Sequence, residues 1–465
     1  MKQGIYIDRG LAETRTAIVE RGRVVEIHVA RDGDPRLTGA VWLGRVVQTM
    51  PELQAASVDT GMAEPGFLRA ADARALAGPD APPKIGIAKL VRRGQVVLVQ
   101  AGRAADDEKA MRLTADIGLL GRTLALHPLL TGVEAPRRVG DEAQRAELKA
   151  LVAEASGGMR VVLRPAAARV PHEQVLAELD RLKAEWAEIE AAAQTAKAPA
   201  LLRPAAGPLA RALVELAPPS AELVAAGDQE LAADLHGLAK ALAPDLLDRI
   251  TLAPATQGID LDQTIDAALA PEVALPGGGR LWIEQTRGMV AIDVDGGGAK
   301  GTPVDINMRA VPEIAHELRL RRLGGPVVID FISMRAGNER KRVETALRRA
   351  FERDPAMVDV GQVDRFSLAS LVRGRQDRSL ADELAEPVRA TPSWHPDVAL
   401  ERVLRRASAE LHGVGPVPVR LTLSSKHAPL LDSAGAARIS ERFGRQVELV
   451  LDSRPLDGFR LERLR

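Results

Sequence analysis

Two short apolar runs in the middle of the chain each end in aspartate. The first run, Met289–Gly298, contains Asp293 and Asp295, and the second run, Gly324–Ile332, contains Asp330. Carboxylates that converge in a cleft repel one another and need a cation, and hard oxygen ligands of this kind select Mg²⁺ or Mn²⁺. Such an ion usually serves phosphate chemistry, because it polarises the phosphoryl oxygen and activates water. The alternative interpretation is that these aspartates are strand-end caps and turn formers.

The segments around the aspartates predict a strand, a helix and a second strand. Both runs are β-branched and apolar, which is typical of strands buried on both faces. Between them, residues 311–323 carry apolar side chains at helical spacing, and Pro312 suits a first helical turn. A strand–helix–strand crossover makes the two strands parallel, so Asp293 and Asp330 should lie side by side at their carboxyl ends if the strands are neighbours. Asp295 should face the same way as Asp293, because side chains alternate along a strand.

A run of basic residues follows the second aspartate. Asn338 is a good N-cap for a helix that we expect to continue through Asp354. The basic side chains of this helix are Arg340, Lys341, Arg342, Arg348, Arg349 and Arg353. Further arginines at 365, 373 and 375 lie in the same segment, and we expect Arg365, Arg373 and Arg375 to lie near the aspartates. The run is either a solvated helix face or a phosphate-binding surface.

Length and composition limit the class of protein. A chain of 465 residues with 46% hydrophobic residues is long enough for several packed domains. Aromatic residues make up only 2%, and the net charge is zero, so any site for a polyanion must come from local clustering. The chain has no cysteine, which excludes disulfides and thiolate metal sites and fits a cytoplasmic protein. No apolar run approaches ~20 residues, so we expect no membrane span, and residues 1–8 indicate a strand and not a signal peptide.

The first quarter of the chain predicts small β units. Residues 1–36 alternate as a three-strand meander, and residues 37–115 contain five short strands separated by glycines, which favours a small barrel. The order of these strands resembles an OB-fold RNA-binding domain, in which aromatics stack on unpaired bases while Lys and Arg follow the phosphates. The candidates for these roles are Phe67, Trp42, Arg45, Arg103 and Lys109. The alternative for Trp42 and Phe67 is that both lie in the barrel core.

Taken together, the motifs resemble the ribonuclease E/G family of bacterial endoribonucleases over nearly the whole chain. The stretches that carry the resemblance are Leu53–Gly61, Gly66–Leu68, Gly94–Gln100, Ile283–Asp295, Asn307 and Glu313–Ile332. The resemblance implies an α/β multidomain protein with a short form of the family's architecture. The implied parts are a ribonuclease H-like subdomain (1–36 with 205–275), an inserted OB-fold barrel (37–115), a mixed α/β segment like a 5′-end sensor (116–200), a DNase I-like α/β nuclease segment (276–385) and a small C-terminal α/β module (390–465).

The resemblance also implies roles for individual residues. Asp293 and Asp330 match the two aspartates that bind the catalytic Mg²⁺, for which Mn²⁺ could substitute. Asp295 stands where the family has Asn and is expected to help bind the metal, whereas Ser333 replaces a family carboxylate. The residues expected to contact RNA are Phe67, Lys109, Arg45, Arg164, Asn307, Arg365, Arg373 and Arg375. An aromatic on the family's RNA-gripping face is Ser57 in this chain.

Several departures from the family concern the 5′ end of RNA and zinc. In the family, a pocket of Arg, Thr, Val and a second Arg binds a 5′-monophosphate, and the first of these matches Arg164. The other three positions hold Pro165, Ala125 and Met357, which removes a hydroxyl, an amide hydrogen and a guanidinium. We therefore expect weakened 5′-monophosphate sensing. The family's paired-cysteine zinc link is absent, so no zinc is expected, and any homodimer is not bridged by zinc.

The sequence therefore predicts a cytoplasmic, Mg²⁺-dependent endoribonuclease that acts on single-stranded RNA in RNA processing or decay. The alternative is an RNA-binding protein of the same family with little or no cleavage activity, for which Ser57 and Ser333 argue. A third hypothesis is a scaffold whose C-terminal module recruits other proteins.

Overall fold

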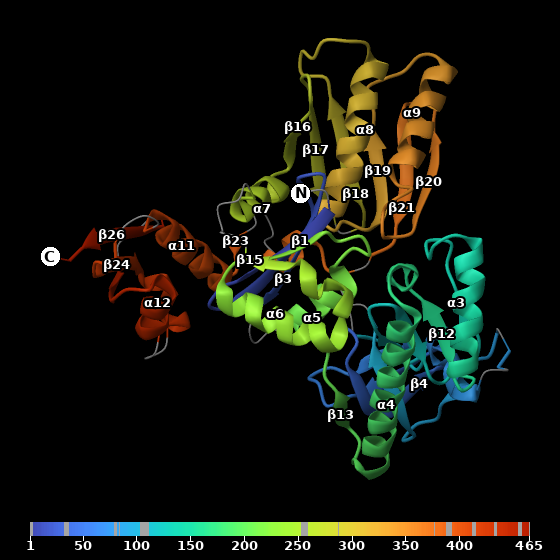
Figure 1. Ribbon diagram of the computed structural model, residues 1–465. Helices are drawn as coiled ribbons and strands as arrows, with labels where there is room; N and C mark the ends of the chain where they lie inside the picture. The colour runs from blue at the N-terminus through green and yellow to red at the C-terminus, as the bar shows by residue number, and fades with distance from the viewer. Residues whose placement is uncertain are drawn as a thin grey trace.

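The protein is a mixed α/β multidomain chain, seen here in a computed structural model. Figure 1 shows a central sheet that contains the N-terminal strands, with further α/β units on either side of it. The structure describes residues 3–31, 37–78, 81–82, 84–102, 111–252, 259–286, 288–375, 377–386, 393–411, 415–431, 435–453 and 458–464.

The central sheet joins two distant parts of the sequence. Its strand order is β15–β14–β1–β2–β3, in which β1 pairs antiparallel with β2 and parallel with β14. The strands are β1 (Gln3–Arg9), β2 (Glu13–Glu20), β3 (Arg23–Arg31), β14 (Leu223–Ala226) and β15 (Ile250–Leu252). One face packs against α5 (Pro208–Arg211), the π-helix η4 (Ala212–Leu216), α6 (Gln229–Leu242) and the 3₁₀ helix η5 (Pro244–Arg249). The other face packs against α7 (Leu261–Leu269), α10 (Leu380–Leu384) and the start of α11 (Pro396–Glu410).

A closed barrel follows the N-terminal strands. Five strands close on themselves because β4 pairs with both β5 and β7, and this confirms the predicted barrel, which is consistent with an OB-fold. The barrel strands are β4 (Val41–Met50), β5 (Ala55–Asp59), β6 (Gly66–Arg69), β7 (Val96–Ala101) and β8 (Arg112–Thr114), with β13 (Ala200–Arg203) added beside β4. Short helices η1 (Pro51–Leu53), α1 (Ala70–Ala73), η2 (Arg74–Ala77) and α2 (Ile87–Leu90) lie between them. Trp42 is buried in the barrel core, as its alternative interpretation predicted.

A four-stranded sheet and two long helices come next, and Figure 1 shows them beside the barrel. The strands are β9 (Leu119–Leu120), β10 (Leu124–His127), β11 (Val133–Glu134) and β12 (Arg160–Leu163), followed by η3 (Pro165–Arg169). The helices are α3 (Glu142–Ala155) and α4 (His172–Thr195), which bury their apolar faces in one core with the sheet. Asp141 and Gln144 form a capping box that fixes the start of α3.

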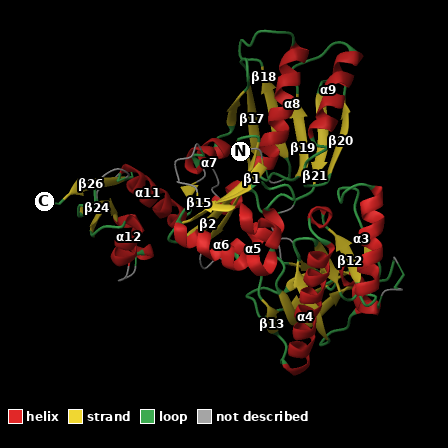
Figure 2. Ribbon diagram, in the orientation of Figure 1, coloured by secondary structure: helices red, strands yellow, loops and turns green. Residues whose placement is uncertain are grey.

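A six-stranded sheet carries the three aspartates. Its order is β16–β17–β18–β19–β21–β20. The strands are β16 (Glu272–Ala274), β17 (Arg280–Gln285), β18 (Val290–Asp295), β19 (Gly325–Asp330), β20 (Val358–Val363) and β21 (Leu368–Arg373). Helices α8 (Pro303–Leu320) and α9 (Gly337–Ala350) cover one face of this sheet, as Figure 2 shows.

Both predicted helix starts in this unit were wrong by position. The first helix begins at Pro303 and not near Val311, because Thr302 and Asp305 form a capping box, so Pro312 lies inside the helix. The second helix begins at Gly337, so Asn338 is its second residue and not its N-cap, and the helix ends at Ala350. The strand–helix–strand order itself is as predicted.

The C-terminal module contains a sheet of order β25–β24–β26. Its elements after α11 are β24 (Val419–Ser424), η6 (Ser425–Leu430), α12 (Gly435–Phe443), β25 (Val447–Asp452) and β26 (Phe459–Arg463), and a two-stranded ribbon of β22 (Ala385–Glu386) and β23 (Ser393–Trp394) precedes α11. Among the helices that the structure describes, none is both long and apolar enough to cross a membrane.

Candidate active site

Asp293 and Asp330 are direct neighbours across a parallel strand pair. Strands β18 and β19 are in register, with Ile292 opposite Ile329 and Asp293 opposite Asp330. The two aspartates therefore lie at the carboxyl ends of adjacent parallel strands, and the adjacency predicted from the sequence is confirmed. Their row continues across the sheet, with Trp282 opposite Asp293 on β17 and Leu368 opposite Asp330 on β21.

The aspartates lie on the face of the sheet that the helices leave uncovered. Ile292, Val294 and Ile329 are buried in the core formed with α8 and α9. Asp293 and Asp330 alternate with these residues and are both exposed. A substrate can therefore approach the aspartate pair from the open face without displacing either helix.

The electrostatics of the pair favour a bound cation. Partial burial raises the pKa of Asp293, and the negative charges of Asp330 and Asp295 raise it further. Mutual repulsion of this kind is relieved when a divalent cation binds between carboxylates. The donor set also fits, because Mg²⁺ is commonly held by one or two carboxylates together with waters and substrate phosphates.

Asp295 is partly engaged by other groups. Its Oδ2 lies 3.2 Å from Nε of Arg280, and its Oδ1 accepts a hydrogen bond of 2.9 Å from the backbone N–H of Gly297. In the parts of the chain that the structure describes, there is no group of three or more His, Cys, Asp or Glu side chains placed to hold a metal. The arrangement therefore favours a site built on two aspartates, with Asp295 beside it.

Asn307 supports the loop that follows Asp330. Its side chain, on α8, is fully buried; the Nδ2 group donates to the carbonyl of Ile332 (2.8 Å), and Oδ1 accepts from the N–H of Ile332 (3.1 Å). The amide thus fixes the backbone two residues beyond the aspartate. Its complete burial does not support the predicted RNA contact and indicates a positioning role instead.

The predicted arginines separate into two groups at opposite edges of the sheet. Arg365 is exposed in the turn between β20 and β21, which lies at the aspartate edge because Leu368 pairs with Asp330. Arg373 pairs with Gly325 at the far end of the same strands, about 17 Å from the aspartate edge at the usual rise per residue. Arg375 follows it, and its Nε donates to the carbonyl of Gly324 (3.3 Å).

Arg373 is also buried, with 4% of its surface exposed. Its guanidinium forms two hydrogen bonds with Asp354 (2.9 and 3.0 Å) and a third with the carbonyl of Leu323 (2.8 Å). The expectation that Arg373 and Arg375 lie near the aspartates was wrong, because β21 runs back across the sheet. The burial of Arg373 does not support an RNA contact.

The basic helix α9 likewise has only its first turn near the aspartates. The loop from Asp330 leads into the start of α9, whereas the end of α9 leads to β20 at the opposite edge. Arg335 is exposed in that loop, and Arg340 donates to the carbonyl of Met334 (2.9 Å). Because α9 packs on the covered face of the sheet, its later arginines are remote from the open face.

The barrel presents a polar row with one aromatic on its outer surface. Phe67 is half-buried there, opposite Ser57 on β5 and opposite Arg112 on β8. Sequence reasoning missed Arg112, although it alternates with the buried Leu113 and so had to face outward. Arg45 is exposed and donates to the carbonyl of Gly94 (3.2 Å). Lys109 and Arg103 lie outside the described residues.

Arg164 is held by backbone carbonyls. Its guanidinium donates to the carbonyl of Gly121, to that of Val214 (2.8 Å) and, over 3.5 Å, to that of Glu215. These contacts tie the four-stranded sheet to the π-helix beneath the central sheet. Pro165 starts the 3₁₀ helix η3, and therefore no amide hydrogen is available at that position.

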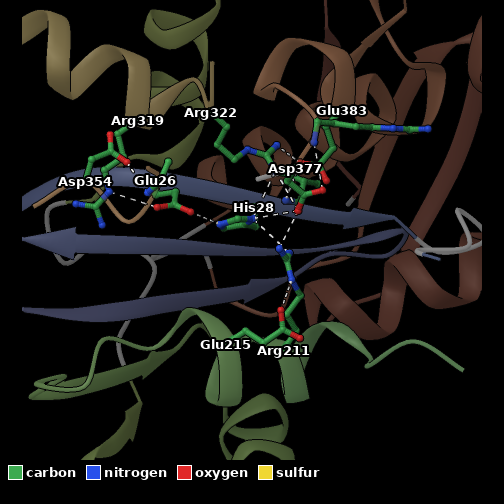
Figure 3. Close-up of polar contacts among 12 residues, drawn as sticks. Glu26, His28, Arg211, Glu215, Arg319, Arg322, Asp354, Asp377 and Glu383 are labelled. Carbon is green, nitrogen blue, oxygen red and sulfur yellow. Dashed lines mark hydrogen bonds and ion pairs between the residues drawn. The ribbon is translucent and has the colours of Figure 1, made fainter. Parts of the chain in front are cut away.

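A buried polar cluster attaches the aspartate-bearing unit to the central sheet (Figure 3). His28 on β3 hydrogen bonds to Glu26 (2.7 Å) and lies against Arg322, just after α8, and against Arg211 on α5. His28 was interpreted from the sequence as an ordinary strand residue, and it has no contact with the aspartates among these bonds. Burial lowers its pKa, and the two arginines lower it further.

These histidines predict a pH-dependent stability. His316 on α8 is also largely buried, and burial together with Arg23 lowers its pKa from 6.5 to about 4. A histidine with a depressed folded pKa stays neutral while the unfolded chain takes up a proton, so stability falls as pH drops below about 6.5. We expect the free energy of unfolding to lose about 2 kcal/mol through His316 between pH 7.5 and pH 5.

Urea unfolding of the wild type and His316→Gln at pH 7.5 and pH 5.0 tests this expectation. The variant should show a smaller loss of stability on acidification than the wild type, whatever its stability at pH 7.5. Equal losses in the two proteins would show that His316 titrates normally in the folded state.

The comparisons with known proteins cover both aspartates. The profile described as "Ribonuclease E/G family" matches residues 118–376. The chain is 31% identical over 395 residues to Ribonuclease G of Haemophilus influenzae, covering 80% of each chain. It is 30% identical over 391 residues to Ribonuclease G of Escherichia coli, covering 79% of each. It is 29% identical over 439 residues to Ribonuclease E of Escherichia coli, covering 88% of this chain and 41% of the other.

Proposed function

The chain belongs to the ribonuclease E/G family, and from that premise we propose that it is a metal-dependent endoribonuclease that hydrolyses phosphodiester bonds in single-stranded RNA. The observation that carries the proposal is the in-register pair of Asp293 and Asp330 on the open face of the sheet. We further propose a cytoplasmic location, a role in RNA processing or decay, and that any homodimer forms without a zinc link, since the chain has no cysteine.

In this proposal the two aspartates would hold Mg²⁺, or Mn²⁺, with Asp295 assisting. The ion, when bound, polarises a phosphoryl oxygen and lowers the pKa of a bound water. Asn307 keeps the backbone after Asp330 in one position through its two bonds to Ile332, which preserves the spacing of the carboxylates. Phe67, Arg45 and Lys109 on the barrel would hold the unpaired strand by stacking and phosphate contacts.

The domain assignments drawn from the family remain part of the proposal. We propose that residues 1–36 and 205–275 form a ribonuclease H-like subdomain and that residues 276–385 form a DNase I-like nuclease segment. The shared sheet of β1 and β14 supports the first assignment, because it joins those two stretches. The segment 116–200 would correspond to a 5′-sensor that has lost part of its pocket.

A loss of 5′-end sensing gives a direct test of function. We expect single-stranded RNAs with a 5′-monophosphate and with a 5′-hydroxyl to be cleaved at rates within about threefold, because one missing charge-assisted hydrogen bond already costs more than that. The measurement is initial-rate cleavage of short RNAs labelled at the 3′ end, in Mg²⁺ and in chelator. Arg164→Gln should leave the ratio of the two rates unchanged, since its guanidinium is engaged by carbonyls.

The outcomes separate the function from the sensing. Cleavage in Mg²⁺ that chelator abolishes would support the endoribonuclease. A strong preference for the monophosphate that Arg164→Gln removes would show that this arginine binds the 5′ end and that our reading of the altered pocket is wrong.

A second candidate is an RNA-binding protein with little or no cleavage activity. Ser333, exposed three residues after Asp330, favours it because the family's carboxylate is missing there. Such a protein would bind RNA equally well in Mg²⁺ and in chelator, and its affinity would fall steeply with salt. Bound RNA that stays intact in both Mg²⁺ and Mn²⁺ would favour this candidate over the nuclease.

A further inference from the structure

We propose that Phe366, together with Arg365, stacks on an unpaired base next to the phosphodiester bond that is cleaved. The inference rests on the proposed function and adds to it a position at which the substrate must present a base. It follows from the exposure of Phe366, from the rigidity of its turn, and from the attachment of that turn to the aspartate strand.

Phe366 is unusual because it is both aromatic and exposed. Aromatic residues are only 2% of the chain. Within the described ranges, Phe366 is the only aromatic side chain that is mostly exposed, with 62% of its surface accessible. Phe331 and Phe351, in the same unit, are buried in its core. A phenyl ring left in water forgoes the free energy of burial, so its position calls for an occupant.

The turn that carries Phe366 is held by its own hydrogen bonds. Oδ1 of Asp364 accepts from the backbone N–H groups of Phe366 (2.8 Å) and Leu368 (2.9 Å). Ser367 has a left-handed backbone with φ of 69°, which closes the turn between β20 and β21. The ring is therefore presented at a defined place before any ligand binds.

The same turn is bonded to the loop that leaves Asp330. Oγ of Ser367 accepts from the N–H of Met334 (2.9 Å), and the carbonyl of Ser367 accepts from the N–H of Phe331 (3.2 Å). Leu368, two residues after Phe366, is the register partner of Asp330. One strand spacing and two residues separate the ring from the aspartate, roughly 10 Å in all. This distance suits the nucleotide that carries the reacting phosphate or its immediate neighbour.

The chemistry of the pair selects an unpaired nucleotide. The guanidinium carbon of Arg365 lies 4.7 Å from the centre of the Phe366 ring, so the cation covers one ring face. The exposed remainder of the ring is available to a base, while Arg365 supplies positive charge for a phosphate. Aromatic and arginine stacking of this kind accepts every base, but it requires that the base be unpaired. The subsite would thus impose single-strandedness and no base identity.

The test uses the full chain under single-turnover conditions and a short single-stranded RNA with one mapped cleavage site. A series of RNAs replaces one nucleotide at a time, on either side of that site, with an abasic residue. We expect the abasic change at one position to slow the wild type by about tenfold to a hundredfold. Phe366→Ala should slow cleavage of the intact RNA by a similar factor and abolish the sensitivity at that position, and Phe366→Tyr should restore both.

Val372→Ala is the matched control, because this exposed side chain lies on the same hairpin at the opposite edge of the sheet. Its abasic profile should equal that of the wild type. If Phe366→Ala keeps the wild-type profile, or cleaves the intact RNA at the wild-type rate, the inference is overturned. A change in the sedimentation of the RNA-free protein in Phe366→Ala would place the ring in a protein interface and would likewise overturn it.

A binding measurement separates this inference from the proposed function. RNAs with 2-aminopurine at each position are titrated with the wild type and with Phe366→Ala in chelator. Quenching at one position that depends on Phe366 supports the stacking even if no RNA is cleaved in Mg²⁺, which would count only against the nuclease. The absence of such quenching in RNA that is bound overturns the stacking even if cleavage is normal.

Discussion

Asp293→Asn is expected to lower the rate of RNA cleavage by about a thousandfold or more, and Asp330→Asn should do the same. Each substitution removes one of the two charged oxygens that face each other across β18 and β19. Several kcal/mol of transition-state stabilisation depend on a correctly held metal, and each 1.4 kcal/mol is a factor of ten in rate. The double variant should be little worse than either single one, because the two carboxylates act as a unit.

The stability of these variants should move in the opposite direction to their activity. The pKa of Asp293 is raised by burial and by Asp330 and Asp295. A carboxyl with a raised folded pKa carries a penalty that is absent below its unfolded pKa and fully present above its folded pKa, hence at neutral pH. In chelator, Asp293→Asn should therefore unfold at an equal or slightly higher temperature than the wild type. Added Mg²⁺ should raise the unfolding temperature of the wild type only.

Asp359→Asn provides the control for this prediction. Asp359 is exposed on β20 and lies opposite the exposed Val372, at the edge of the sheet remote from the aspartate pair. The substitution removes one negative charge from the same unit without touching the pair, so cleavage and the Mg²⁺ effect should remain. Wild-type cleavage in Asp293→Asn, measured beside this control, would rule out the proposed metal site.

The aspartate pair could be predicted from the sequence because its determinants are local. Two apolar runs ending in aspartate, with a helical segment between them, allow few arrangements, and strand periodicity then fixes which face Asp293 and Asp295 share. The barrel was predictable for the same reason, since short strands and glycines leave few ways to close. Here the chain's periodicity and its tertiary structure agree.

The destinations of individual polar side chains could not be read in the same way. Arg365 and Arg373 are eight residues apart in one hairpin, yet the run of β21 places them at opposite edges of the sheet. Asn307 lies in a polar stretch of helix, and only the path of the loop after Asp330 shows why its amide is buried. A charged residue has the same letter whether it binds a phosphate or a buried carboxylate, so the partner decides its role.

Arg373 gives the second large effect, and it is an effect on stability. The side chains of Arg373 and Asp354 are 5% and 4% exposed and are joined by two hydrogen bonds. Removing one partner of a buried pair leaves an uncompensated charge, which typically costs about 3–5 kcal/mol. We expect Arg373→Gln and Asp354→Asn to lower the free energy of unfolding by that amount, as measured by urea denaturation. Arg9→Gln, which breaks the exposed pair with Asp234, should cost less than about 1 kcal/mol.

The RNA affinity of Arg373→Gln decides between a structural and a binding role for this arginine. If the guanidinium only holds β21 to Asp354 and Leu323, the folded variant at low temperature should bind RNA with the salt dependence of the wild type. A phosphate contact predicts the reverse, with unchanged stability, weaker binding and a salt slope reduced by about one. The double variant Arg373→Met/Asp354→Leu sharpens the distinction, because replacing both buried charges with apolar groups should recover part of the lost stability. Recovery of stability without any change in RNA binding would identify the pair as a support for the strand that positions Leu368 and, through it, Asp330.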